Sequence, residues 1–165
     1  MTASTTLIRI MSVLGMLLSA YALYVEHRKA EDELYVAACD INSWVACSKV
    51  FTSKYGRMMS LLGLVPSGHA LDLPNAAYGL LFYVCAFFHD DLAFLPRRLR
   101  AAIMLFAASA AAASSVWLGY VLYNILHDAC IVCISTYVVN TVILIAAISS
   151  MFAAAFPPVM DKKTQ

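Results

Sequence analysis

Residues 129–137, with the sequence ACIVCISTY, open the last apolar segment of the chain and carry its most informative motif. The motif is a Cys-x-x-Cys pair, Cys130 and Cys133, placed where an uncharged segment begins. Residues three and four apart share a helix face, so Cys130, Cys133 and Tyr137 are predicted to form one stripe. Asp128 is a candidate N-cap, and the positive potential of a helix N-terminus lowers a thiol pKa. A reactive dithiol with a phenol one turn deeper favours redox chemistry on a lipid-soluble substrate.

Two structural interpretations of this pair compete with redox chemistry. A Cys-x-x-Cys is half of a zinc site, but tetrahedral sites usually need two such pairs. The chain has no second Cys-x-x-Cys and no His-x-x-x-His, so we expect no metal. Free cysteines also pack well in apolar cores. Redox chemistry is the favoured interpretation of the two thiols.

The composition is that of an integral membrane protein. Of 165 residues, 62% are hydrophobic and only 13% charged, whereas soluble domains have about a quarter charged residues. The mean hydropathy is +0.78. We therefore expect an all-α membrane protein, a single domain over residues 1–165 built as a four-transmembrane-helix bundle in contact with membrane lipid. The predicted spans are residues 8–26, 75–95, 100–126 and 129–156, with a lumenal cap over residues 27–74 between helices 1 and 2. The net charge of +1 gives no indication of a nucleic-acid partner.

Three segments admit more than one interpretation. The first span resembles a signal peptide, but its long apolar run and weakly basic start favour an uncleaved helix. The second is uncharged only as far as Phe88. That is shorter than the roughly 20 residues of a full span, so it must end at residues 92–95 or near the interface. Residues 58–65 are apolar but too short to span, which is typical of a lid or an interfacial segment.

Charge in the short loops predicts the orientation. The loop after the second span carries Arg97, Arg98 and Arg100, and the turn between the last two spans has no Lys or Arg. The positive-inside rule then places both termini in the cytosol. Lys162 and Lys163 lie third and fourth from the end, as in a dilysine signal for retrieval to the endoplasmic reticulum. We therefore expect a multi-pass protein of the endoplasmic-reticulum membrane.

A second cysteine pair, Cys39 and Cys47, has seven residues between its thiols. In a four-span protein the first and third loops lie on the same side, so this pair shares the oxidising lumen with Cys130 and Cys133. The pair is either a structural disulfide or a shuttle that relays electrons by thiol–disulfide exchange, and the spacing leaves both open. The nearby Cys-x-x-Cys favours the shuttle. Cys85, in the second span, is expected to serve packing.

Together these residues resemble the vitamin K epoxide reductase family over nearly the whole chain. The matching motifs are Cys39-x7-Cys47, Ser48-x-x-Phe51, Tyr55-Gly56-Arg57, Pro74-Asn75, and Cys130-Ile-Val-Cys133 followed by Thr136-Tyr137. Each motif alone is weak, whereas their joint order is specific. The family includes the reductase and a reductase-like paralogue, and Tyr55, where the reductase often has Trp, inclines slightly towards the paralogue.

The resemblance implies reduction of vitamin K 2,3-epoxide to the quinone and of the quinone to the hydroquinone. It makes Cys133 the thiol that engages substrate and Cys130 its resolving partner. Cys47 would exchange with Cys130, and Cys39 would receive electrons from a thioredoxin-like lumenal oxidoreductase. No cofactor is expected to be tightly bound, because vitamin K quinone or epoxide is the substrate. Coumarin-type inhibitors such as warfarin are expected to occupy the same pocket.

The resemblance also supplies the substrate-binding residues. It makes Asn75 and Tyr137 hydrogen-bond donors to the two quinone carbonyls, where negative charge grows during reduction. The aromatic side chains expected to line the pocket are Phe51, Tyr55, Tyr78, Phe82 and Tyr83. From the residues alone, other roles stay open: Asn75 as a helix cap, Tyr137 as an interfacial tyrosine, and the aromatics as core or belt.

Two other functions use much the same parts. A quinone-linked thiol oxidase would run electrons from protein thiols to quinone, and the direction depends on the potentials of partner and substrate. A claudin-like tetraspan scaffold also has a tryptophan and two cysteines in its first loop, as Trp44 does here. Such a scaffold needs no dithiol at a helix mouth, so Cys130 and Cys133 favour an enzyme. We expect a monomer.

Overall fold

The computed structural model describes residues 3–42, 44–66 and 68–156, and every regular element in these ranges is helical. The elements are α1 (Ala3–Glu31), α2 (Cys47–Phe51), the 3-10 turn η1 (Lys54–Gly56), α3 (Met58–Leu61), α4 (Asn75–Phe88), α5 (Arg97–Val121), the π-helical turn η2 (Leu122–Leu126) and α6 (Ile131–Ala155). The predicted all-α class is therefore confirmed. The dilysine pair lies outside the described residues.

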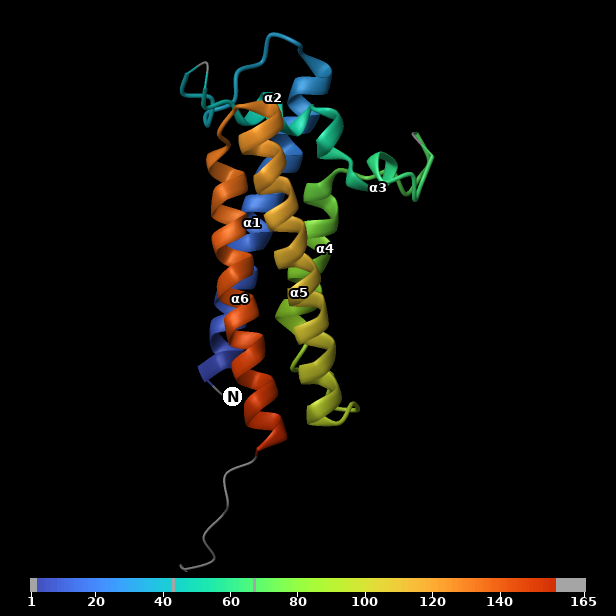
Figure 1. Ribbon diagram of the computed structural model, residues 1–165, viewed down its shortest axis with the longest axis vertical. Helices are drawn as coiled ribbons and strands as arrows, with labels where there is room; N and C mark the ends of the chain where they lie inside the picture. Colours follow the sequence, from blue (N-terminus) through green and yellow to red (C-terminus); the bar gives the residue numbers. More distant parts are fainter. Residues whose placement is uncertain (1–2, 43, 67, 157–165) are drawn as a thin grey trace, which may run out of the picture.

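Three helices are long and apolar enough to cross a membrane by their length and composition. They are α1, α5 with its π-helical continuation, and α6. Figure 1 shows them running along the long axis of the molecule. The fourth apolar helix, α4, has only 14 residues. At 1.5 Å per residue it is about 21 Å long, which is short of the roughly 30 Å hydrocarbon core of a bilayer.

The predicted helix boundaries need correction at several ends. Helix α1 begins before residue 8 and continues past residue 26 to Glu31, so the cap starts later than expected. Helix α4 starts at Asn75 as predicted, but its extension to residue 95 is wrong. Residues 89–96 form turns instead, because two aspartates and Pro96 follow the apolar run. Helix α5 then begins directly after that proline.

The bundle packs through α1 and α6. Helix α1 contacts α4 and α6 extensively, α6 contacts α5, and α4 makes few contacts with α5. One close approach depends on Gly15 of α1: a Cβ there would lie 2.4 Å from the ring of Tyr83 on α4. Tyr83 is only 2% exposed and belongs to the main core with Ile8 and Ile143. A glycine thus lets an aromatic ring fill the centre of the bundle.

The segment between α1 and α4 covers one end of the bundle (Figure 1). Helix α3 and the following loop project sideways from the helices and expose Leu61, Leu62 and Leu64. Upstream, η1 is held close to α2, because a Cβ on Gly56 would lie 2.4 Å from the carbonyl oxygen of Phe51. Only glycine fits there, and this explains the glycine of the Tyr-Gly-Arg motif.

Candidate active site

Backbone pairing brings the two cysteine pairs together. The N–H of Ala129 donates to the carbonyl of Trp44 at 2.7 Å, and the N–H of Ala46 donates to the carbonyl of Ala129 at 3.1 Å. Val45 and Ala129 consequently form a short parallel bridge. Cys47 starts α2 two residues after Val45, and Cys130 directly follows Ala129. Two thiols 83 positions apart in sequence are thereby placed side by side.

The four thiols form a linear chain of contacts. Cys39 interacts through its side chain with Cys47, Cys47 with Cys130, and Cys130 with Cys133. All four are free thiols. The inner two, Cys47 and Cys130, are fully buried, whereas Cys39 and Cys133 at the ends are partly exposed. This order suits stepwise thiol–disulfide exchange between an outer and an inner thiol.

Three of these four thiols, Cys39, Cys47 and Cys130, have raised, not lowered, pKa values. Burial, followed by the neighbouring Cys47 thiol, raises the pKa of Cys39 to about 12. The Cys130 thiol and then burial raise the pKa of Cys47. The adjacent Cys133 thiol is the main cause that raises the pKa of Cys130. The expected lowering by a helix N-terminus is therefore wrong for Cys130, because the Cys133 thiol and burial raise its pKa more than the Cys47 thiol and the helix N-terminus lower it.

The N-cap of α6 is Cys130 and not Asp128. The Sγ atom of Cys130 accepts a hydrogen bond from the backbone N–H of Cys133 at 3.2 Å. Asp128 is 92% buried and pairs with Lys49 of α2, whose Nζ lies 3.0 and 3.2 Å from its two carboxylate oxygens. This ion pair fastens α2 to the segment before α6. The sequence gives little indication of this ion pair, because an aspartate just before a helix is typical of an N-cap.

A second carboxylate orders the loop around Cys39. Asp40 accepts hydrogen bonds from the Ser48 hydroxyl at 2.6 Å, the Ser48 N–H at 3.0 Å and the Ala37 N–H at 3.0 Å. Burial works to raise the pKa of Asp40, but these hydrogen bonds outweigh it and leave the pKa below its usual value. Asp40 thus ties the residue after Cys39 to the residue after Cys47.

These residues also form a candidate metal-binding group. Ligand atoms of Cys39, Asp40 and Cys47 all lie within 4.8 Å of one another. Both carboxylate oxygens of Asp40 already accept hydrogen bonds, so the aspartate is committed to the loop. The expectation of no metal remains a prediction.

A large cavity begins at Cys133, the last of the four thiols. Its volume is about 430 Å³, it is lined mainly by apolar side chains, and α1, α4, α5 and α6 all contribute to its wall. Cys133 lines it, whereas the other three thiols of the chain do not. The six residues predicted to bind substrate all line the cavity: Phe51, Tyr55, Asn75, Tyr78, Phe82 and Tyr137. The fold thus gathers from four segments the residues that the sequence pattern singled out.

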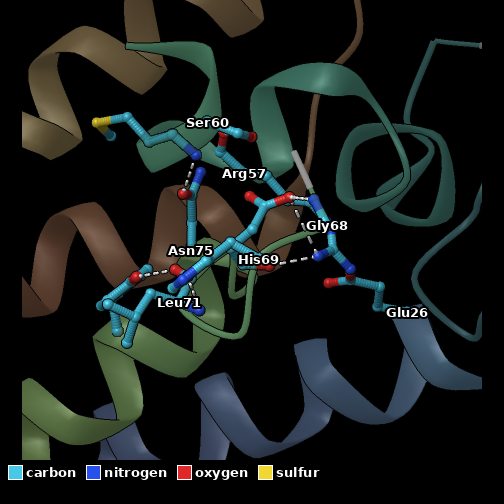
Figure 2. A network of polar contacts seen from close by, with 10 residues as sticks. Glu26, Arg57, Ser60, Gly68, His69, Leu71 and Asn75 are labelled. Carbon is cyan, nitrogen blue, oxygen red and sulfur yellow. Dashed lines mark hydrogen bonds and ion pairs between the residues drawn. The ribbon is translucent and has the colours of Figure 1, made fainter. Parts of the chain in front are cut away.

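Asn75 fastens the cap to α4 and does not cap the helix. Its Oδ1 accepts the backbone N–H of Met58 at 2.8 Å, and its Nδ2 donates to the carbonyl of Tyr55 at 2.7 Å. The N-cap position is Pro74, with no side-chain cap. Figure 2 shows the amide of Asn75 within this network. An amide nitrogen carries two N–H groups, so one remains for a ligand in the cavity.

A neighbouring network holds the loop after α3. Arg57 donates to the backbone carbonyl of Asp72, and its Nη2 lies 3.4 Å from Oε1 of Glu26 on α1 (Figure 2). The hydroxyl of Tyr78 donates to the carbonyl of Leu71. Tyr78 therefore lines the cavity, while its hydroxyl is hydrogen-bonded to the loop before α4.

Sequence reasoning missed a polar ladder on the cavity wall. The hydroxyl of Tyr83 donates to Oδ1 of Asn140 at 2.8 Å, and Nδ2 of Asn140 donates to Oγ of Ser115 at 2.9 Å. These side chains come from α4, α6 and α5, and all three line the cavity. The sequence offered one indication of this ladder. Asn140 is the only side-chain amide in α6, and polar residues inside a membrane span need partners.

Comparison with known proteins agrees with this geometry. The profile of the vitamin K epoxide reductase family matches residues 6–148. The mouse protein named vitamin K epoxide reductase complex subunit 1 is 36% identical over 127 residues, which cover 76% of this chain and 77% of the mouse protein. The rat protein of the same name is 35% identical over the same shares. The chain therefore belongs to the vitamin K epoxide reductase family.

Proposed function

We propose that this thiol-dependent oxidoreductase reduces vitamin K 2,3-epoxide to the quinone and the quinone to the hydroquinone. The observation that carries the proposal is the linear chain of four thiols. It ends at Cys133, which is the one thiol of the four that lines the apolar cavity. The names of the mouse and rat relatives support the substrate. Site residues from the family resemblance line that cavity, which supports their roles in binding.

The proposed chemistry balances two electrons in each step. Cys130 and Cys133 give up two electrons and two protons and form a disulfide, while the epoxide becomes quinone and water, or the quinone becomes hydroquinone. Cys133 is the thiol that meets the substrate, because it lines the cavity. Cys47 then attacks Cys130, which it contacts, and restores the inner dithiol as a Cys39–Cys47 disulfide forms. A thioredoxin-like dithiol reduces that disulfide at the partly exposed Cys39.

Asn75 and Tyr137 would orient the quinone ring. Tyr137 lies one turn from Cys133 on α6, and Asn75 begins α4 across the cavity. Neutral donors suit carbonyl oxygens that gain negative charge in a site from which water is excluded. The apolar walls leave room for an isoprenoid substrate or for a coumarin-type inhibitor in the same place. No tightly bound cofactor is required by this scheme.

The membrane arrangement follows from the same proposal. Helices α1, α5 and α6 span the bilayer, and α4 is a short fourth span, so that the thiol end faces the lumen of the endoplasmic reticulum and both termini face the cytosol. The exposed leucines after α3 rest on the lumenal membrane surface. The chain forms a single domain and works as a monomer.

The test uses purified protein in detergent with dithiothreitol and vitamin K epoxide. Quinone formation is expected to disappear in Cys133→Ala and to weaken about tenfold or more in Asn75→Ala, since one donor to a charged oxygen is lost. Cys85→Ala, which removes the thiol outside the chain of contacts, serves as the matched control and is expected to keep full activity.

Two results would overturn the proposal. Epoxide turnover that survives Cys133→Ala would remove the assigned chemistry. Absence of epoxide turnover, combined with net oxidation of protein thiols by added quinone, would establish the quinone-linked thiol oxidase instead.

A further inference from the structure

A second cavity, of about 310 Å³, lies at the end of the bundle opposite the thiols. Residues from the start of α1, the end of α4, the start of α5 and the end of α6 line it. Its polar side chains include His89, Asp90, Arg97, Arg100 and Ser150. None of these residues takes part in the redox scheme, so the cavity needs an explanation of its own.

Both carboxylates beside this cavity already have arginine partners. Nη2 of Arg9 lies 2.5 Å from Oδ1 of Asp91, and Nη1 of Arg100 lies 3.2 Å from Oδ1 of Asp90. The two aspartates of this loop are therefore matched one to one. Any further cation at this end of the bundle lacks a protein carboxylate among the described residues.

Two further arginines make this end of the bundle positively charged. Nε of Arg98 donates to the carbonyl of Ala154 at the end of α6. Arg97 has no hydrogen bond or ion pair with any part of the chain that the structure describes, and its side chain lines the cavity. Among the residues that the structure describes, four arginines and two aspartates lie at this end of the bundle. The guanidinium of Arg97 borders the cavity, and no carboxylate of the described residues pairs with it.

Unpartnered polar atoms point to a missing acceptor. Nε of Arg100 and Oγ of Ser150 are buried and make no hydrogen bond within the described residues, and both residues line the cavity. A buried donor without a partner destabilises the protein, so an acceptor in the cavity would be favoured. Helix α5 adds the positive end of its dipole at the same place, with no side-chain cap on its first N–H groups.

We propose that this cavity binds the phosphate of an anionic phospholipid. Guanidinium groups bind phosphate through paired, charge-assisted hydrogen bonds, and the start of a long helix favours the same charge. Basic pockets between membrane helices are known sites for acidic lipid headgroups. The cavity exceeds the size of one phosphate group, which leaves space for part of the glycerol ester.

The surroundings favour a lipid over free phosphate. Phe94 is 79% exposed and Phe88 is 54% exposed, and both lie in or next to the loop between α4 and α5. On α5, Ile103 and Phe106 are 50% and 78% exposed. Acyl chains of a lipid whose phosphate sits in the cavity would cover such side chains, whereas inorganic phosphate would leave them uncovered.

The experiment is native mass spectrometry of the full chain in mild detergent. The protein is titrated with dioleoylphosphatidic acid and, separately, with dioleoylphosphatidylcholine. One phosphatidic acid is expected to remain bound per protein, and Arg97→Gln is expected to weaken it about tenfold, as for loss of one charge-assisted contact. Arg98→Gln removes an equal charge from the neighbouring residue that does not line the cavity, and it is expected to change the affinity less than about twofold.

The outcomes separate the lipid from its alternatives. Equal affinity of the unaltered protein and Arg97→Gln, or equal retention of phosphatidic acid and phosphatidylcholine, would overturn the site. Inorganic phosphate that binds as tightly as phosphatidic acid would overturn the lipid assignment and leave a soluble anion. Unchanged thermal unfolding of Arg97→Gln would show that its weaker binding does not come from misfolding. The result does not depend on the redox proposal, because no thiol is involved.

Discussion

The two halves of this molecule are held together by different forces. The cap and the loop before α6 are joined by polar contacts: the Lys49–Asp128 pair, the hydrogen bonds of Asp40, and the backbone bridge at Ala129. The bundle below is held by close packing around Tyr83 and Gly15. Hydrogen-bonded loops can shift by small amounts, whereas interlocked helices move only as units. The proposed electron relay thus depends mainly on the polar contacts of the cap, and the cavity is walled mainly by the packed helices.

The largest expected effect lies in the cap and concerns electron flow. Cys47→Ala should reduce turnover with a thioredoxin-like donor by at least about 100-fold, because Cys39 then has no thiol through which to reach Cys130. Turnover with dithiothreitol should be retained to a much greater extent, since a small dithiol can attack the Cys130–Cys133 disulfide directly at the partly exposed Cys133. The ratio of the two rates is the measurement. Equal loss with both donors would show a structural role for Cys47.

The next effect lies in the bundle and concerns packing. Gly15→Ala places a methyl group 2.4 Å from the Tyr83 ring and should destabilise the protein by about 1–3 kcal/mol. Gly119→Ala is the matched control, because a Cβ there stands at an ordinary 3.6 Å from Tyr137. Thermal unfolding in detergent checks both variants. Similar melting temperatures for the two would contradict the described packing of α1 on α4.

Removal of the Lys49 cation from the cap should destabilise the cap by about 1–2 kcal/mol. Lys49→Met leaves the buried carboxylate of Asp128 without its partner, although the exposed lysine head limits the loss. The expected sign is faster local opening of the cap. Hydrogen exchange of α2 amides measures it, and Lys54→Met, on a neighbouring exposed lysine, is the comparison. Unchanged exchange in Lys49→Met would show that the pair does not hold α2.

The smallest effect depends on pH and on Asp40. Its pKa is lowered in the folded protein, so the stability it contributes is present above its unfolded pKa and is lost as the pH falls towards the folded value. Ser48→Ala should cost about 1 kcal/mol at pH 7 and should make the loss of stability in acid shallower. Chemical unfolding between pH 7 and pH 3 tests both signs. An unchanged acid profile would contradict the role of Ser48.

Local sequence patterns predicted the helices well, because apolar runs and prolines act over a few residues. The start of α4 at Asn75 and the residues around the cavity followed from such patterns and from the family motifs. The end of α4 was missed because two aspartates stop the helix sooner than membrane thickness would require. The placement of Cys47 against Cys130 depends on backbone pairing between distant segments, and no local signal encodes it. The raised pKa of Cys47 follows mainly from that same proximity.

The complete burial of Cys47 and Cys130 has a consequence for selectivity among reductants and oxidants. In the proposed lumenal arrangement, dissolved glutathione, peroxides and alkylating reagents would meet only the end thiols, because the two central thiols are buried. In the proposed relay, reducing power would enter at Cys39 and leave at Cys133, without passing to unrelated disulfides at the buried thiols between them. Burial of the two central thiols would thus shield the proposed relay from dissolved redox reagents.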